Sequence, residues 1–461
     1  MMAQQETEAG ILGRYFRLLE LADPVACQGR VTQVVGLTVE VEGLTARIGD
    51  LCFITSERGQ SPVSAEVIGF RNHRLVLMPL SELGGIRPGS EVMPRSSLFT
   101  VPVGPELLGR VVDSFGRPLD NRGPIGASAS YPLTNGSPGV MTRSRILTPL
   151  PTGVRAIDGL LTCGRGQRVG IFAGSGVGKS TLLGMIARQS RADVNVIALI
   201  GERGREVQDF IDTDLGDAGL SRSVVVVSTS DQPALMRVKA AWVATVMAEY
   251  FRDQGLQVAL LMDSVTRFAM AQREIGLAAG EPPTVRGYTP SVFALLPKLM
   301  ERTGTAELGA ITAFYTVLVE ADDLNEPVTD AVRGILDGHI VLSRDLLAAN
   351  RYPPIDVLSS ISRLMPSVAS GVHLRRSGIV RDALATYQDA RDLINIGAYV
   401  RGSNPKLDVA IDVMPQIEAF LRQAADECAP FESTTAALDA IAGSLESSGV
   451  YGNHRPQENK T

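Results

Sequence analysis

The spacing of hydrophobic positions changes twice along the chain. Between residues 11 and 21 apolar side chains recur at helical spacing, which predicts a short amphipathic helix. Residues 28–94 alternate apolar and polar positions between frequent glycine turns, a pattern typical of a small β-barrel or sandwich. From about residue 152, apolar strand-length runs alternate with helix-length segments, which predicts a parallel sheet with helices on both faces.

The order of these patterns predicts how the chain is divided into domains. Buried strands are expected in the apolar runs 168–173, 194–200, 224–228, 258–262 and 310–319. After about Pro366 the strands cease, and helices are expected at 384–394, 415–427 and 434–445. We therefore expect a docking helix at 1–24, a β-barrel at 25–96, a connector at 97–151, an α/β domain at 152–366, a helical domain at 367–445 and a tail at 446–461.

Charge and cysteine content exclude several classes of protein. The 461 residues include 44 Lys and Arg against 50 Asp and Glu, a net charge of −6, so no nucleic-acid partner is expected. The four cysteines form no C-x-x-C pair, so neither a disulfide framework nor a zinc site is expected. The first residues are polar and acidic and no apolar run reaches the length of a membrane span, which indicates a cytoplasmic protein.

The segment GIFAGSGVGKSTLLGMIA, residues 170–187, has the order of a P-loop: an apolar strand, a glycine-rich turn and an amphipathic helix. The glycines let backbone N–H groups point at a phosphate, and the start of the helix adds its positive dipole end. Lys179 is expected to bridge the β- and γ-phosphates, and the Ser180 hydroxyl to bind Mg²⁺. Ala173 replaces the first glycine of the motif. The predicted loop contacts are Gly174, Ser175, Gly176, Val177, Gly178, Lys179, Ser180 and Thr181.

Two further strands are followed by acidic residues. The run 258–262 ends in Asp263, which we interpret as the second protein ligand of the Mg²⁺ that accompanies a nucleotide. The run 194–200 leads into Gly201, Glu202 and Arg203. A carboxylate in this position beside the γ-phosphate could polarise the attacking water, whereas a solvated surface glutamate is the alternative that these residues alone leave open.

Several motifs together resemble one family. The P-loop is followed by GERGRE, LLMDSVTRFA, EADDLNEPVTD and RDLLAANRYPPIDVLSSISRLMP. This combination closely resembles the type III protein-export ATPases of the bacterial flagellum and the injectisome, which are related to the catalytic subunits of rotary ATP synthases. The resemblance implies an α/β P-loop (RecA-like) nucleotide-binding core, an N-terminal β-barrel, a C-terminal helical domain and hydrolysis of ATP with Mg²⁺.

The resemblance also implies roles for individual residues. Glu202 would activate water, and Arg203 would stabilise charge in the same subunit. Arg267 resembles a further arginine on the phosphate side, although a plain surface arginine is the alternative. Tyr352 matches the aromatic residue that stacks on adenine. Arg363 matches the arginine finger that reaches across a subunit interface.

One chain carries both Glu202 and Arg363, so two neighbouring copies could complete a site and a head-to-tail ring, in this family a homohexamer, is expected. In the segment 280–304, Arg286 and Tyr288 are candidates for contact with a central stalk protein or an exported chain; a rigid structural turn is the alternative. The helix within residues 1–21 matches the position at which the family binds a stator-like regulatory partner; packing of this helix on its own domain is the alternative.

The resemblance favours an ATPase that docks on the membrane proteins of an export gate, at the inner face of the cell membrane. There it would release or unfold substrates delivered by export chaperones, with a flagellar system favoured over an injectisome. A catalytic subunit of a rotary proton or sodium ATPase is the alternative. An RNA translocase like Rho shares the P-loop core, but the acidic chain and the lack of a basic, aromatic stretch in its barrel argue against it.

Overall fold

A computed structural model describes residues 28–56, 61–95, 99–319, 323 and 325–451. The amphipathic helix expected at residues 11–21 lies outside this part of the chain. The chain divides into two compact units, the first made of residues 1–99 with 278–280 and the second of residues 100–277 with 281–461. Among the described helices, none combines the length and apolar character that a membrane crossing requires.

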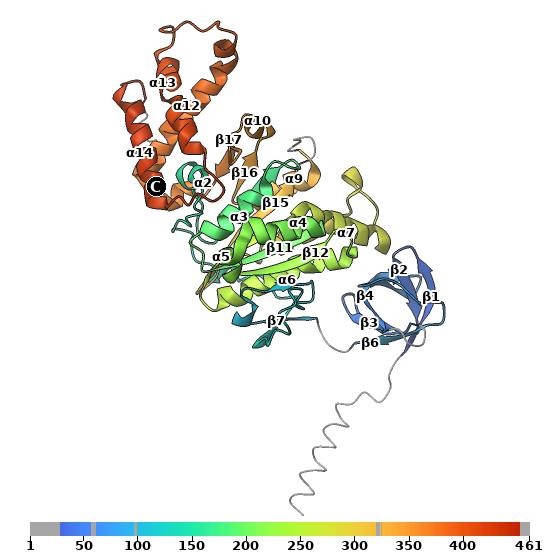
Figure 1. Ribbon diagram of the computed structural model, residues 1–461. Helices are drawn as coiled ribbons and strands as arrows, with labels where there is room; N and C mark the ends of the chain where they lie inside the picture. Colours follow the sequence, from blue (N-terminus) through green and yellow to red (C-terminus); the bar gives the residue numbers. More distant parts are fainter. Residues whose placement is uncertain (1–27, 57–60, 96–98, 320–322, 324, 452–461) are drawn as a thin grey trace, which may run out of the picture. The chain divides into compact units, whose positions relative to one another are not determined.

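The first unit contains a closed β-barrel, drawn in blue in Figure 1. Neighbouring strands are antiparallel, and β1 closes the barrel by pairing with β6. Alternate residues point inward, so Val39, Val41 and Val67 are fully buried. This confirms the barrel predicted from the period-two pattern. The barrel order is β1 (Gly29–Val35), β2 (Thr38–Glu42), β5 (Arg74–Pro79), β4 (Val63–Arg71), β3 (Leu51–Ile54) and β6 (Glu91–Pro94).

The second unit is built on a nine-stranded sheet that includes all five predicted buried strands. Strands β10, β15, β13, β11 and β12 pair in parallel, as expected. The main path is β17 (Ile355–Ser362), β16 (Gly338–Leu342), β10 (Arg168–Ala173), β15 (Ala310–Leu318), β13 (Gln257–Asp263), β11 (Val194–Glu202), β12 (Ser223–Thr229) and β8 (Val111–Val112). A short strand, β14 (Gly304–Thr305), pairs antiparallel with β15.

The sheet also contains a strand that the sequence analysis does not predict, β17, which runs antiparallel to β16. The two strands are joined by the five-residue helix α10 (Arg344–Ala348) and the turn around Tyr352. Such a helix is only about 7 Å long, too short to carry the chain back along the sheet for a parallel crossover. The chain therefore turns back beside the carboxyl end of β16. As a result, β17 ends beside the amino ends of the parallel strands.

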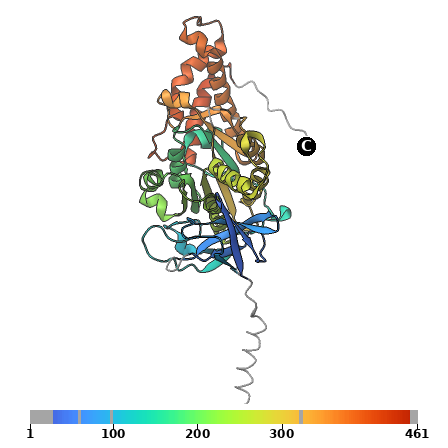
Figure 2. The ribbon, with the colours of Figure 1, turned by 90° about the vertical axis from the view of Figure 1, so that its right-hand side faces the viewer.

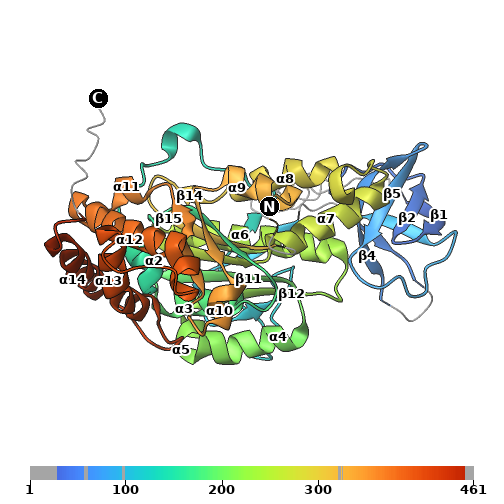
Figure 3. The same ribbon diagram turned by 90° about the horizontal axis from the view of Figure 1, so that it is seen from above.

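Helices cover both faces of the sheet, as Figure 3 shows. One face carries α3 (Lys179–Gln189), α4 (Gly204–Asp209), the π-helical turn η3 (Phe210–Leu215) and α5 (Gly216–Ser221). The other carries α6 (Ala234–Asp253), α7 (Val265–Ala279) and α8 (Pro290–Met300). Helix α6 is apolar over most of its circumference because it packs on four strands of the sheet and on neighbouring elements.

Residues 97–151 are treated in the sequence analysis as a connector, but the part from Thr100 onward adds structure to the second unit. Strand β7 (Thr100–Val103) pairs with β9 (Ala129–Pro132), and β8 forms the edge of the main sheet. An ion pair anchors the part of this segment that follows β9: Arg302 and Glu249 have side chains 3% and 0% exposed, with 2.6 Å between Nη2 and Oε2. Arg302 also donates to the Leu133 carbonyl, and Asn135 donates to Glu249.

The C-terminal region is helical, as predicted, and is drawn in orange to red in Figure 2. It consists mainly of α12 (Gly371–Asn395), α13 (Pro405–Leu421) and α14 (Phe431–Ser447). The helix expected at 415–427 has different bounds. The Asn404 side chain caps the backbone N–H groups of Lys406 and Leu407 and starts α13 ten residues earlier, with Pro415 inside the helix. The segment after Leu421 leaves the helix and runs back to the nucleotide-binding core.

Candidate active site

The glycine-rich loop joins β10 to α3 at the carboxyl edge of the sheet. Strand β10 ends at Ala173, which is buried and pairs with β15 and β16, so a methyl group is accommodated there. Gly176 and Gly178 have φ values of 75° and 91°, which L side chains rarely adopt. Ser175, Gly176 and Ser180 are exposed, whereas Val177 is buried in the core below the loop. This is the strand, turn and helix arrangement that the P-loop motif predicts.

Three of the residues that the sequence analysis assigns to catalysis or Mg²⁺ binding lie together beside this loop. The Lys179 Nζ atom lies 2.5 Å from Asp263 Oδ1 and 3.9 Å from Glu202 Oε1. Their side chains are only 10%, 2% and 13% exposed, respectively. Arg267 joins the cluster, with Nε 3.5 Å from Glu202 Oε1. The sheet assembles the cluster because β13 and β11 pair in parallel, with Leu199 opposite Asp263, and both strands end at the edge that carries the loop.

The backbone around Glu202 is shaped to receive Arg267. Gly201 has a φ of 69°, and the pairing of β11 with β12 shifts register between Ile200 and Glu202. A Cβ atom on Gly201 would lie 2.7 Å from Cδ of Arg267, so only glycine leaves room for the arginine. The irregular end of β11 therefore sets both the direction of Glu202 and its contact with a cation.

The surroundings of Glu202 raise its pKa from 4.5 to about 7. Burial is the largest cause, followed by the negative charge of Asp263, and a hydrogen bond with Glu206 acts in the same direction. The positive charges of Lys179 and Arg267 oppose this shift. A carboxyl group with a pKa near neutrality can accept a proton at physiological pH, as a general base requires.

Asp263 has a partner that the sequence analysis did not identify. Thr316 on β15 donates from Oγ1 to Asp263 Oδ1 at 2.8 Å, and both groups are buried. The available signal was a pair of threonines, Thr312 and Thr316, within the otherwise apolar run 310–319. Such a hydroxyl needs a buried partner, but only the pairing of β13 with β15 shows that the partner of Thr316 is Asp263.

Tyr352 lies over the other end of the loop. A Cβ atom on Gly178 would lie 3.1 Å from Cε2 of Tyr352, so the aromatic ring packs on the last glycine before Lys179. Tyr352 is partly buried, and its carbonyl accepts a hydrogen bond from the Gln423 backbone at 2.8 Å. The segment after α13 thus holds in place the aromatic residue that the sequence analysis assigns to adenine.

Four other predicted site residues lie apart from this cluster. Arg203 has a 79% exposed side chain that pairs with Glu206 at 3.4 Å. Arg363 is exposed and directly follows β17. Its backbone N–H donates to the Asp337 carbonyl. Arg286 is half exposed and pairs with Asp323 at 2.9 Å. Tyr288 is only 4% exposed, with its ring edge-on to Phe293, so its side chain does not offer a surface to a partner.

The oxygen atoms at the loop suit a magnesium ion that is held jointly by protein and nucleotide. The Ser180 hydroxyl is exposed at the first turn of α3, and Asp263 stands beside Lys179. Among the described residues, no three His, Cys, Asp or Glu side chains cluster as metal ligands. Mg²⁺ commonly takes one or two protein oxygens and completes its octahedron with phosphate oxygens and water, so this small donor set fits the ion.

These features define a P-loop nucleotide-binding core with a buried acidic and basic cluster at the loop. Residues 153–362 match the nucleotide-binding domain of the ATP synthase alpha/beta family, and residues 31–95 match the β-barrel domain of that family. Residues 369–440 match the T3SS EscN ATPase C-terminal domain. The class is therefore an ATPase of the ATP synthase alpha/beta family.

Individual relatives narrow the class. The chain is 55% identical over 430 residues to the flagellum-specific ATP synthase of Bacillus subtilis, covering 93% of this chain and 98% of that protein. It is 50% identical over 413 residues to a type 3 secretion system ATPase of Xanthomonas euvesicatoria, covering 90% and 93%. The assembled ATPase EscN, solved with its central stalk EscO, superposes with a TM-score of 0.83 at 46% identity and covers 90% and 100%. The chain belongs to the type III secretion and flagellar export ATPases.

Proposed function

We propose that this chain hydrolyses Mg²⁺-bound ATP as a homohexameric ring and thereby energises type III protein export, in a flagellar system. One observation carries the ring: within a single chain, the P-loop and Arg363 lie at opposite edges of the sheet. Within one subunit, Arg363 then cannot reach the phosphate site of that same subunit. The arginine finger of each site would have to come from a neighbouring copy.

The topology of the sheet supports this separation. Asp337 donates its N–H to the carbonyl of Arg168, the first residue of β10, and accepts from the N–H of Arg363. Arg363 therefore stands where β10 begins, whereas the P-loop stands where β10 ends. Six residues of strand separate the two edges by about 20 Å, beyond the reach of an arginine side chain.

Each residue at the loop would have its own role in ATP hydrolysis. Glu202 would accept a proton from the attacking water, while Lys179 would move from Asp263 towards the β- and γ-phosphates. Ser180 and Asp263 would hold Mg²⁺, which when bound neutralises part of the phosphate charge. Arg267 would keep the Glu202 carboxylate in place, and Tyr352 would stack on adenine. Arg363 of a neighbouring copy would stabilise the charge on the γ-phosphate in the transition state.

The proposed partners follow from the family and from the exposed residues. EscN assembles with the central stalk EscO, and we assign a similar stalk to this chain, with Arg286 as a contact candidate. Residues 1–21 would bind a stator-like regulatory partner. The ring would dock on the membrane proteins of the export gate from the cytoplasmic side and release or unfold substrates delivered by export chaperones. No nucleic-acid partner is proposed.

The match of residues 369–440 to the EscN C-terminal domain favours export over a rotary proton or sodium ATPase. The high identity to the Bacillus subtilis protein supports the flagellar system. Replacing the chromosomal copy of this chain by the inactive Glu202→Gln variant in its own bacterium tests that choice: the substitution should abolish flagellar assembly and leave injectisome secretion intact. Normal flagella with the inactive variant would contradict the flagellar assignment.

Turnover per subunit as a function of protein concentration tests the ring. If each site needs a neighbouring Arg363, specific activity should rise with concentration as subunits associate, and Glu202→Gln should abolish it at every concentration. Activity that is independent of concentration, in a protein that stays monomeric by sedimentation, would contradict the proposal. A chain that assembles but needs a different subunit for turnover would favour the rotary alternative.

A further inference from the structure

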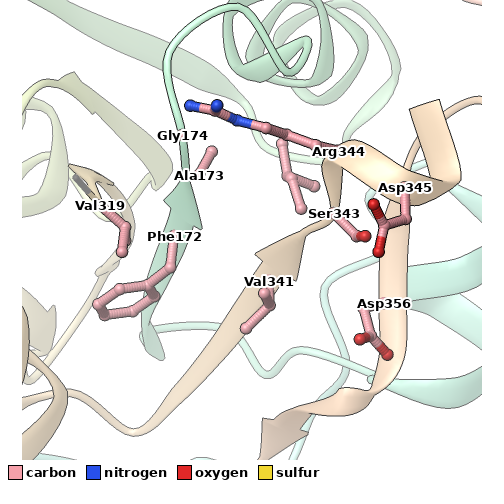
Figure 4. A pocket seen from close by; sticks show the side chains of 10 residues that line it. Phe172, Ala173, Gly174, Val319, Val341, Ser343, Arg344, Asp345 and Asp356 are labelled. Carbon is pink, nitrogen blue, oxygen red and sulfur yellow. The ribbon is translucent and has the colours of Figure 1, made fainter. Parts of the chain in front are cut away.

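Arg344 lies against the first residues of the P-loop, on the side away from Glu202. Strand β16 pairs in parallel with β10, and Leu342 stands opposite Ala173. The two residues after Leu342 therefore leave the sheet at the same edge as Gly174. Figure 4 shows the Arg344 side chain extending from α10 towards Gly174, along a cavity of about 220 Å³.

The contact between Arg344 and Gly174 is close. A Cβ atom on Gly174 would lie 2.6 Å from Nη2, 2.8 Å from Nε and 3.1 Å from Cζ of Arg344. Unlike Gly176 and Gly178, Gly174 does not have a positive φ, so its backbone conformation does not itself require glycine. The guanidinium of Arg344 therefore packs on the bare backbone of the loop at Gly174.

The described acidic residues of this cavity do not neutralise Arg344. Asp356 accepts hydrogen bonds from the N–H groups of Leu358 and Ser359 and from the Ser359 hydroxyl. Figure 4 shows Asp345 and Asp356 on the far side of the cavity from the guanidinium. The exposed Arg344 side chain instead extends towards the loop at Gly174.

We propose that Arg344 is a positioning residue that braces the P-loop at Gly174 and adds positive charge at the phosphate site, so that ATP is held more tightly than ADP. This inference rests on the proposed binding of ATP at this loop. The contribution should grow with the negative charge of the ligand, because Coulomb attraction is proportional to charge. Removing Arg344 should therefore weaken MgATP binding about tenfold and MgADP binding about threefold.

The test uses the full-length protein and fluorescent derivatives of ATP and ADP with Mg²⁺. Arg344→Ala should raise the Kd for the ATP derivative more than that for ADP and raise KM more than it lowers kcat. Arg344→Lys should recover part of the ATP preference, because it restores the charge without the planar contact. Arg391→Ala removes an equal charge from an exposed position on α12 and should leave both Kd values unchanged.

A double-mutant cycle separates the contact from the charge. Gly174→Ala places a methyl group where the guanidinium lies and should displace it, which weakens ATP binding with Arg344 still present. In the Arg344→Ala background the same substitution meets no guanidinium, so the two losses should not add. Additive losses would overturn the proposed contact. If Arg344→Ala does not fold, Gly174→Ala measures the loss of the contact, and Arg344→Lys measures how much ATP preference the charge alone retains.

The outcomes also distinguish this inference from the proposed function. Lys179→Ala should abolish ATP binding if the loop is the nucleotide site. Loss of binding with Lys179→Ala, together with ATP and ADP affinities in Arg344→Ala equal to those of Arg391→Ala, would overturn the role of Arg344 alone. Undiminished ATP binding in Lys179→Ala would remove the nucleotide site itself, and the role of Arg344 with it.

Discussion

The raised pKa of Glu202 predicts how catalysis depends on pH. Glu202 must be ionised to accept a proton, and its surroundings raise its pKa from 4.5 to about 7. With that value, about one tenth of the carboxyl groups are ionised at pH 6 and about nine tenths at pH 8. The second-order constant kcat/KM, which reports the pKa values of the free enzyme, should therefore rise about tenfold between these pH values.

The Glu206 neighbour supplies a specific perturbation of this profile. A hydrogen bond with Glu206 favours the protonated form of Glu202, and the same bond lowers the pKa of Glu206. Glu206→Gln replaces the acceptor carboxylate by a neutral amide, so the pKa of Glu202 should fall and the rise of kcat/KM should move to lower pH. Asp212→Asn, a charge-matched change at an exposed position on η3, should leave the midpoint in place.

The assay is steady-state ATP hydrolysis from pH 5.5 to 8.5 with Mg²⁺ in excess, so that ATP stays complexed throughout. Sedimentation at each pH would confirm that the assembly state is unchanged. A kcat/KM that is flat across this range would refute the assignment of Glu202 as a base of raised pKa. A midpoint that is the same in wild type, Glu206→Gln and Asp212→Asn would refute the role of Glu206.

Three further substitutions test other parts of the structure. Gly178→Ala should weaken ATP binding at least tenfold, because it strains a residue with a φ of 91° and crowds Tyr352, whereas Gly334→Ala, which meets open space, should bind normally in the same titration. Thr316→Val keeps the side-chain shape but removes the hydrogen bond to Asp263, so a Mg²⁺ titration of hydrolysis should show a higher Mg²⁺ requirement and a kcat about tenfold lower; an unchanged requirement would exclude a role for Thr316. Arg302→Ala leaves Glu249 charged in a site where its side chain is 0% exposed, and thermal and urea unfolding should show a loss of about 3–5 kcal/mol; a loss below about 1 kcal/mol would contradict a buried, unpaired charge.

The parts of the site that depend on local sequence could be predicted. The P-loop requires only a strand, two glycines with positive φ and a helix start, and all of these are contiguous from residue 168 to residue 181. Asp263 and Glu202 could be placed because parallel strands bring their carboxyl ends to one edge of a sheet. The five buried strands could be located because each is a largely apolar run of strand length.

The remaining features depend on contacts between distant segments. Thr316 and Arg344 acquire their roles from strands that neighbour the site in space, and neither belongs to a motif that names its partner. Tyr288 has the polar, aromatic character of a contact residue, yet it is buried against Phe293. The start of α13 was missed because the cap at Asn404, rather than the proline at 415, sets the first turn.

The most direct test of the shared site mixes two inactive variants. Glu202→Gln lacks the base but keeps Arg363, and Arg363→Ala lacks the arginine finger but keeps Glu202. If the finger acts between subunits, mixed rings contain interfaces where an intact Glu202 faces an intact Arg363. Random mixing in equal amounts should then restore about a quarter of wild-type turnover, although each variant alone is inactive. No recovery, in mixtures shown to form rings of both variants, would contradict a site completed by a second copy of this chain.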